Sequence, residues 1–351
     1  MVTATGPETD QPNRSRRSAG GRGSTGPGKR RISSLEVLCA VLVVAVLGQN
    51  WLGDLLDVPA LRTGATVFVA VCVQAMPFLV LGVLISGAIA AFVPAKLLRK
   101  VLPANPALAV PVAGLAGVAL PGCECASVPV ARRLMQQGVP EPVALAFLLA
   151  APAVNPVVLV ATSVAFPTAP RMVLARFLAS LLTAVVMGWV WTRFGRRQWI
   201  MDRALRAVPI RSGTSKWAVF AETARSDLAE AGGFLVIGGL TAATLNVLVP
   251  QSWFAVVGRN AIIGVVVMAF LAVILALCSE ADAFVAASLS ALPLLPRLVF
   301  LVVGPAVDVK LIALQAGTFG RAFAARFAPT TFLVATGCAV LVGLVLLGGY
   351  R

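Results

Sequence analysis

Apolar runs of roughly 18 or more residues recur along nearly the whole chain. A run of that length crosses about 30 Å of hydrocarbon as an α-helix, which rises about 1.5 Å per residue. The composition agrees, because 59% of the 351 residues are hydrophobic and 12% are charged. Soluble domains hold roughly 45–50% and 25% of these classes. The sequence therefore excludes a soluble globular protein and predicts an all-α polytopic membrane protein with about 7–9 transmembrane helices.

The N-terminal part of the chain is expected to lie outside the main membrane bundle. Residues 1–31 are rich in Gly, Ser, Pro and Arg and have no apolar periodicity, which predicts a disordered basic cytoplasmic tail. Residues 32–63 supply an extra N-terminal transmembrane helix over 33–52 and a loop. This apolar run lacks a small-residue cleavage site, so we expect a retained helix and not a cleaved signal peptide.

Charge predicts the topology. The tail and the segment 193–225 are the strongest basic blocks, and both are expected in the cytoplasm of a plasma-membrane protein. The candidate spans are 64–93, 139–166, 170–194, 229–250, 298–320 and 327–349, whereas 106–137 and 260–292 are apolar but interrupted. Two basic blocks on the same side of the membrane must be separated by an even number of crossings. Four uninterrupted spans already lie between them, so 106–137 is expected to enter and leave on one side as a re-entrant hairpin. Residues 195–228 then form a basic cytoplasmic linker with a short interfacial helix.

An internal repeat is visible in the sequence. Residues 74–94 align without gaps on 230–250 at 8 of 21 positions, and 145–155 align on 298–308 at six of eleven. The sequence thus predicts two permease repeats, 64–194 and 229–351, which the charge-based topology inverts. Inverted repeats with broken elements near the midplane are typical of secondary transporters.

The first interruption carries closely spaced thiols. Cys123 and Cys125 flank Glu124 beside a Pro-Gly pair that favours a break in the helix. Soft thiolates select thiophilic species such as trivalent arsenicals, Cu(I) or Zn(II), and the repeat places Cys278 as a third thiol. The alternative is that these cysteines are small buried hydrophobes, which is our expectation for Cys39, Cys72 and Cys338. Asn155 is predicted either to line the substrate cavity or to be a packing amide.

Five charged residues fall within or beside membrane segments: Glu124, Glu280, Asp282, Asp308 and Lys310. Each charge at that depth costs about 2.5–3.5 kcal/mol, so we predict a role in coupling or in an ion pair. Asp308 and Lys310 are two residues apart and are expected to diverge on a regular helix. Lys310 is therefore expected to pair with Glu280 or Asp282, either as a structural bridge or as the counter-charge to a titrating carboxylate.

Three signatures accompany these residues: Cys-x-Cys in PGCECASVPVARRLMQQG, Pro-Ala-x-Asn-Pro in LLAAPAVNPVVLVAT, and Gly-Pro-x-x-Asp-x-Lys in GPAVDVK. Together they resemble the predicted permeases of the YraQ type, whose relatives include the ArsP organoarsenical efflux permeases. The resemblance covers about residues 64–349. It implies an inner-membrane permease that in some members exports trivalent organoarsenicals.

A secondary permease is the leading functional prediction. The chain has no Gly-rich phosphate loop with Lys and Ser or Thr, so we do not expect ATP hydrolysis. As a permease, the chain is expected to be no enzyme and to bind no cofactor. The alternatives are a membrane thiol oxidoreductase and a non-transporting scaffold subunit. The net charge of +15 is spread over loops and does not predict nucleic-acid binding. The expected partners are the lipid bilayer and a small-molecule or metalloid substrate. Assembly into a homo-oligomer is left open by the sequence.

Overall fold

The computed structural model describes residues 59–94, 103, 105–120, 124–205, 215–248, 261–289 and 292–348, all within the compact unit Ser33–Arg351. The predicted tail 1–31, the predicted helix 33–52 and Cys123 lie outside the described residues. All regular structure in the described ranges is helical. The helices are α3 (Pro59–Phe92), α5 (Pro106–Ala116), η1 (Gly117–Ala119), α6 (Glu124–Gln136), α7 (Glu141–Val154), α8 (Pro156–Ala165), α9 (Arg171–Phe194), η2 (Arg197–Trp199), α10 (Asp202–Leu205), α11 (Lys216–Leu248), α13 (Ala261–Leu275), α14 (Asp282–Ser288), α15 (Leu294–Ala306), α16 (Val309–Thr318) and α17 (Arg321–Leu346).

Five helical segments of this part of the chain are long and apolar enough to cross a membrane, counting α7–α8 and α15–α16 as one segment each. The α7–α8 and α15–α16 segments are the most buried of the five, at 72% and 83% over their most apolar stretch. They form the centre of the bundle. The outer segments α3 and α17 are only 28% and 33% buried, which leaves most of their apolar surface for lipid.

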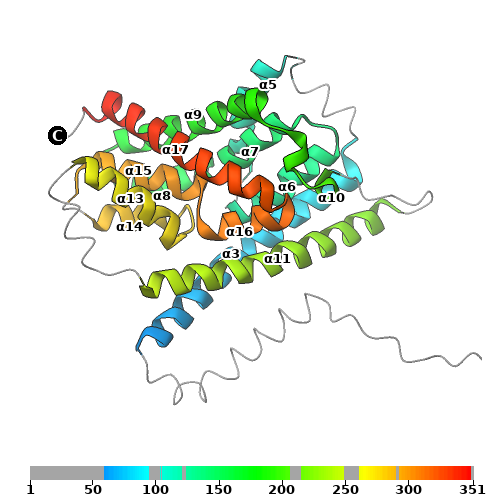
Figure 1. Ribbon diagram of the computed structural model, residues 1–351, viewed down its shortest axis with the longest axis horizontal. Coiled ribbons are helices and arrows are strands. Elements are labelled where there is room, and N and C mark those ends of the chain that lie inside the picture. The colour runs from blue at the N-terminus through cyan, green and yellow to red at the C-terminus, as the bar shows by residue number, and fades with distance from the viewer. Residues whose placement is uncertain are drawn as a thin grey trace, which may run out of the picture. The chain divides into compact units, whose positions relative to one another are not determined.

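The two longest helices, α3 and α11, form an antiparallel pair along one side of the bundle (Figure 1). Near one end Gly87 packs against Phe220, and further along Gly239 packs against Phe68. The chain was expected to form an interfacial helix before residue 229 and a separate span after it. That expectation is wrong, because α11 is one continuous helix with no Pro in its interior.

Both central segments are broken in the middle, at Asn155 and at Asp308. The side chain of Asn155 accepts a hydrogen bond from the Val158 amide at 3.0 Å and so begins α8. Asp308 begins α16 in the same way, with the Leu311 amide at 2.6 Å. The expectation that 139–166 and 298–320 are uninterrupted spans is therefore wrong. A short polar side chain competes for the first amides of the next helix and fixes the break.

The first apolar interruption is built as a hairpin of α5, η1 and α6. Near the start of α5, the Ala107 carbonyl accepts a hydrogen bond from the Trp189 indole, close to the end of α9. At the end of α6, the Gln136 amide donates to the Ala204 carbonyl in α10, which follows α9. Both ends of the hairpin thus reach the same end of the bundle, which is the arrangement that a re-entrant hairpin requires.

Candidate functional site

A buried cluster of charges lies where the first hairpin meets the break between α15 and α16. Lys310, in the first turn of α16, forms an ion pair with Glu124 at the start of α6. The Lys310 Nζ atom also lies 3.6 Å from Oδ2 of Asp308. The three side chains are at most 3% exposed. One lysine therefore faces two carboxylates in the interior of the bundle.

The observed partners of Lys310 differ from the predicted ones. Lys310 was expected to pair with Glu280 or Asp282 and to diverge from Asp308, and both expectations are wrong. Asp308 lies at the break in extended conformation and not on the helix, so its side chain can turn toward a residue only two positions away. Glu280 instead accepts a hydrogen bond from the Cys278 thiol at 2.7 Å.

Asp282 belongs to a second buried ion pair, with Arg176 of α9 at 2.8 Å. The Arg176 guanidinium also donates to the Thr162 hydroxyl and to the Ser279 carbonyl. This network joins α14 and the turn before it to α8 and α9. Arg176 was not predicted as a site residue, although an arginine inside an apolar run was the available signal.

A small cavity adjoins the charged cluster. It has a volume of about 170 Å³ and is lined by the α3 segment around Gln74, the turn Leu275–Cys278 and Lys310. Within that turn Ala276 has φ 48°, a left-handed conformation that L-residues adopt only under constraint. The cavity therefore combines an amine, an amide, a thiol and a strained backbone in one place.

Two of the three thiols predicted to bind substrate, Cys125 and Cys278, lie in this region, and Cys123 lies outside the described residues. Cys125 and Cys278 are both buried and belong to the same core cluster. Neither forms a disulfide, and within the described residues no group of three His, Cys, Asp or Glu side chains could hold a metal ion. Cys72 and Cys338 are also buried. Asn155 is fully buried at the break before α8.

One buried carboxylate oxygen of the cluster has no hydrogen-bond partner among the described residues. Glu124 is 1% exposed, and its Oε2 atom has no hydrogen-bond partner among the residues that the structure describes. A buried carboxylate oxygen without a donor is costly and is uncommon in folded proteins. Among the described residues, this oxygen is therefore free to accept a hydrogen bond from a polar group of a ligand.

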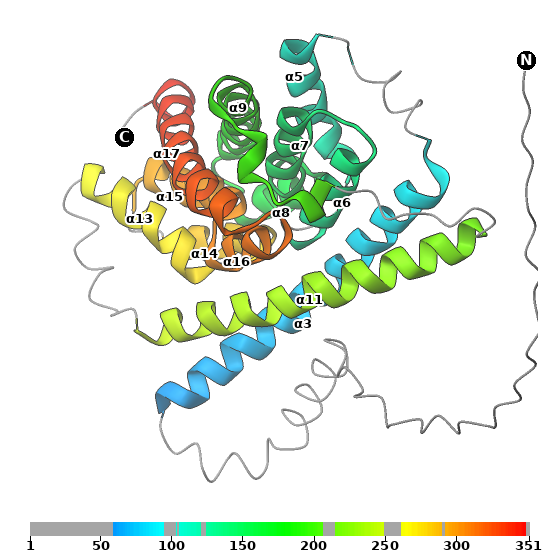
Figure 2. The same ribbon diagram turned by 45° about the vertical axis from the view of Figure 1, so that its right-hand side comes forward.

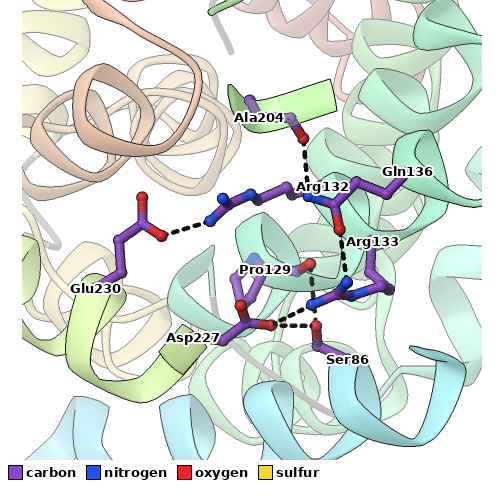
Figure 3. A network of polar contacts seen from close by, with 8 residues as sticks. All are labelled: Ser86, Pro129, Arg132, Arg133, Gln136, Ala204, Asp227 and Glu230. Carbon is purple, nitrogen blue, oxygen red and sulfur yellow. Dashed lines mark hydrogen bonds and ion pairs between the residues drawn. The ribbon is translucent and has the colours of Figure 1, made fainter. Parts of the chain in front are cut away.

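A third polar network joins α6 to the α3–α11 pair (Figure 3). Arg132 pairs with Glu230 at 2.6 Å, and Arg133 lies 3.4 Å from Asp227. Asp227 also accepts a hydrogen bond of 2.5 Å from Ser86 of α3. We call these five residues the α6–α11 lock. Asp227 and Glu230 were not predicted as site residues, although two acidic residues at the edge of a basic segment were the available signal.

The fold and the site together define the class of protein. An all-α polytopic bundle that holds buried charges at a broken central helix has features typical of membrane transporters. The chain matches the ArsP_1 family, described as predicted permease, over residues 61–344. The chain belongs to this family.

Two curated relatives agree with this assignment. The chain is 31% identical over 285 residues to a putative two-component membrane permease complex subunit of Streptococcus mutans, covering 80% of this chain and 94% of that protein. It is 34% identical over 288 residues to the UPF0718 protein YcgR of Bacillus subtilis, covering 81% and 96%. No solved structure matches the chain.

Proposed function

We propose that this permease is a secondary transporter that exports a small thiophilic solute, such as a trivalent organoarsenical or a soft metal species, across the plasma membrane. The carrying observation is the buried Lys310 cluster beside a cavity that also holds the Cys278 thiol. Charges at this depth are usually kept for a substrate or ion pathway. Cys125 in the same core cluster and Cys123 beside it in sequence would add soft ligands.

The same proposal assigns the chain to two inverted permease repeats, 64–194 and 229–351, joined by the basic linker 195–228. The matching breaks at Asn155 and Asp308 support it, because the sequence alignment pairs these two residues. With the basic segments in the cytoplasm, the N-terminus is cytoplasmic as well. The α6–α11 lock then closes the cytoplasmic end of the site.

Coupling to protons is the energy source that these residues can supply. The chain has no His, so a carboxylate would have to bind and release the proton. Asp308 and Glu124 both face Lys310, which can neutralise only one of them at a time. Glu280, on the turn that lines the cavity, is the other candidate for this role. Because the S. mutans relative is named as a subunit of a two-component complex, we extend the proposal to a second membrane component.

The test is a deletion strain challenged with methylarsenite, arsenite, copper and zinc, scored for growth and for cell-associated metal or arsenic. We expect sensitivity and accumulation for a thiophilic species, restored by the wild-type gene. Cys125→Ser should fail to restore resistance at normal membrane abundance, whereas Cys338→Ser, which is also buried, should restore it. Unchanged growth and content with every species would reject the cargo that we propose.

A further inference from the structure

Helix α8 carries an apolar face that is largely exposed in the described part of the chain. Val157, Val160 and Val164 are 45%, 61% and 62% exposed. Their spacing of three and four residues places them on one side of the helix. The opposite side of α8 is buried, with Val158 and Thr162 fully covered.

The corresponding face of α16 is covered by α11. The alignment that pairs Asn155 with Asp308 pairs Val157 with Lys310 and Val164 with Gly317. A Cβ atom at Gly238 of α11 would lie 2.7 Å from the Lys310 Cα atom. The ring of Phe234, one turn earlier in α11, occupies the space where a side chain at position 317 would stand. This face of α16 is therefore a docking surface for the Phe234–Gly238 edge of α11.

Helix α3 carries the same edge. Phe78 and Gly82 align with Phe234 and Gly238 in the repeat. In the structure this edge packs on α6 and not on α8, since a Cβ atom at Gly82 would lie 2.5 Å from the Ala126 Cα atom. The α3–α11 pair, which runs along one side of the bundle (Figure 2), thus packs on α6 and α16. Among the described residues, neither helix makes a comparably extensive contact with the matching surfaces of the core on α8 and α14.

We infer that the face of α8 formed by Val157, Val160 and Val164 is a second docking surface for α3, occupied in the other conformation of the transporter. In that conformation each repeat adopts the packing that the other repeat has here. Helix α3 then leaves α6 and packs on α8, and α11 leaves α16 and packs on α14. The inference rests on the proposed function as an alternating permease. It names the specific contact that closes the opposite end of the site.

The α6–α11 lock holds the conformation seen here. Each of its ion pairs joins α6 to α11, and Ser86 adds α3 through Asp227. The two ion pairs must break if α3 and α11 leave α6 together, whereas the Ser86–Asp227 bond lies within the α3–α11 pair and can persist. Release of the lock should therefore raise the occupancy of the α3–α8 contact, because a ligand or mutation shifts a two-state equilibrium by its differential effect on the two states.

Two matched cysteine pairs test the inference in the full-length chain, in membranes and in a background without native cysteines. Phe234→Cys with Gly317→Cys reports the contact seen in the structure. Phe78→Cys with Val164→Cys occupies the aligned positions and reports the inferred contact. A short bifunctional thiol reagent should crosslink the first pair in the parent and the second pair weakly. Adding Asp227→Asn should raise the crosslinking rate of the second pair by roughly fivefold or more and lower that of the first.

The outcomes separate this inference from the proposed function. Crosslinking of the first pair with none of the second, even with Asp227→Asn, would mean that the α8 face only meets lipid and would overturn the inference. Transport would then still stand on the resistance assay. Crosslinking of the second pair without any resistance phenotype would support the docking surface and reject the proposed cargo. When differently tagged chains are coexpressed, purification by one tag under denaturing conditions and detection of the other identifies crosslinks between two copies.

Discussion

Replacing Lys310 by Met should destabilise the protein strongly, and a second change at Glu124 should reverse most of the loss. The side chains of Lys310, Glu124 and Asp308 are 3%, 1% and 0% exposed. Lys310→Met removes the one cation from this cluster and leaves both carboxylates buried. Met fills a similar volume, so the packing changes little while the charge balance changes completely.

The expected magnitude follows from this burial. Removing one partner of a buried ion pair costs about 3–5 kcal/mol, because the remaining charge is left uncompensated. On the scale of large soluble domains, where 1 kcal/mol shifts Tm by about 2–4 °C, the loss is on the order of 10 °C. The double variant Lys310→Met with Glu124→Gln removes one positive and one negative charge, so the net charge of the cluster is the same as in the parent. Asp308 keeps its hydrogen bond to the Leu311 amide. We expect it to recover more than half of the loss.

The assay is thermal unfolding of the purified full-length protein in lipid nanodiscs, read as a double-mutant cycle. Arg225→Met is the matched control, because Arg225 forms an exposed ion pair with Glu222 and should leave Tm unchanged. A Lys310→Met variant that melts within about 2 °C of the parent would refute the reasoning. So would a double variant that is no more stable than Lys310→Met alone.

The same variants separate the two roles left open for Lys310. A stable double variant that still transports would make the ion pair a structural bridge. A stable double variant that binds substrate but does not drive uphill transport would make Lys310 the counter-charge of a coupling carboxylate. Either result requires that the protein be folded, which the unfolding assay establishes first.

Three further outcomes are expected. Single cysteines at Gln137 and Ser215 should both be protected from an impermeant thiol reagent outside intact cells, and labelling at Gln137 alone would replace the hairpin by a full span. Cys125→Ser should abolish thiophile export measured in inverted vesicles, whereas Cys338→Ser should leave it unchanged. Full activity of both variants would mean that these thiols only fill space in the core. Asp308→Asn should permit substrate exchange but stop uphill transport, and full uphill rates after the proton gradient is collapsed would reject proton coupling.

The position of each charge could be recognised from the sequence, but its partner could not. Glu124, Asp308 and Lys310 stood out because a charge in an apolar run is costly wherever it lies. The presence of a charge in an apolar run can be read from the local sequence, without knowledge of what surrounds it. The pairing of Lys310 with Glu124 depends on the start of α6 meeting the break between α15 and α16, far along the chain, which only the packing decides.

The sequence by itself determined the all-α polytopic class and the permease family. A long apolar run in hydrocarbon forms an α-helix, because each backbone amide and carbonyl must find its hydrogen-bond partner within the same segment. The family signatures are local as well. The tertiary structure decided that Asp282 pairs with Arg176 and that α3 and α11 pack on one pair of core helices. These features depend on which surfaces meet across the bundle, and that choice is made by the packing of distant segments.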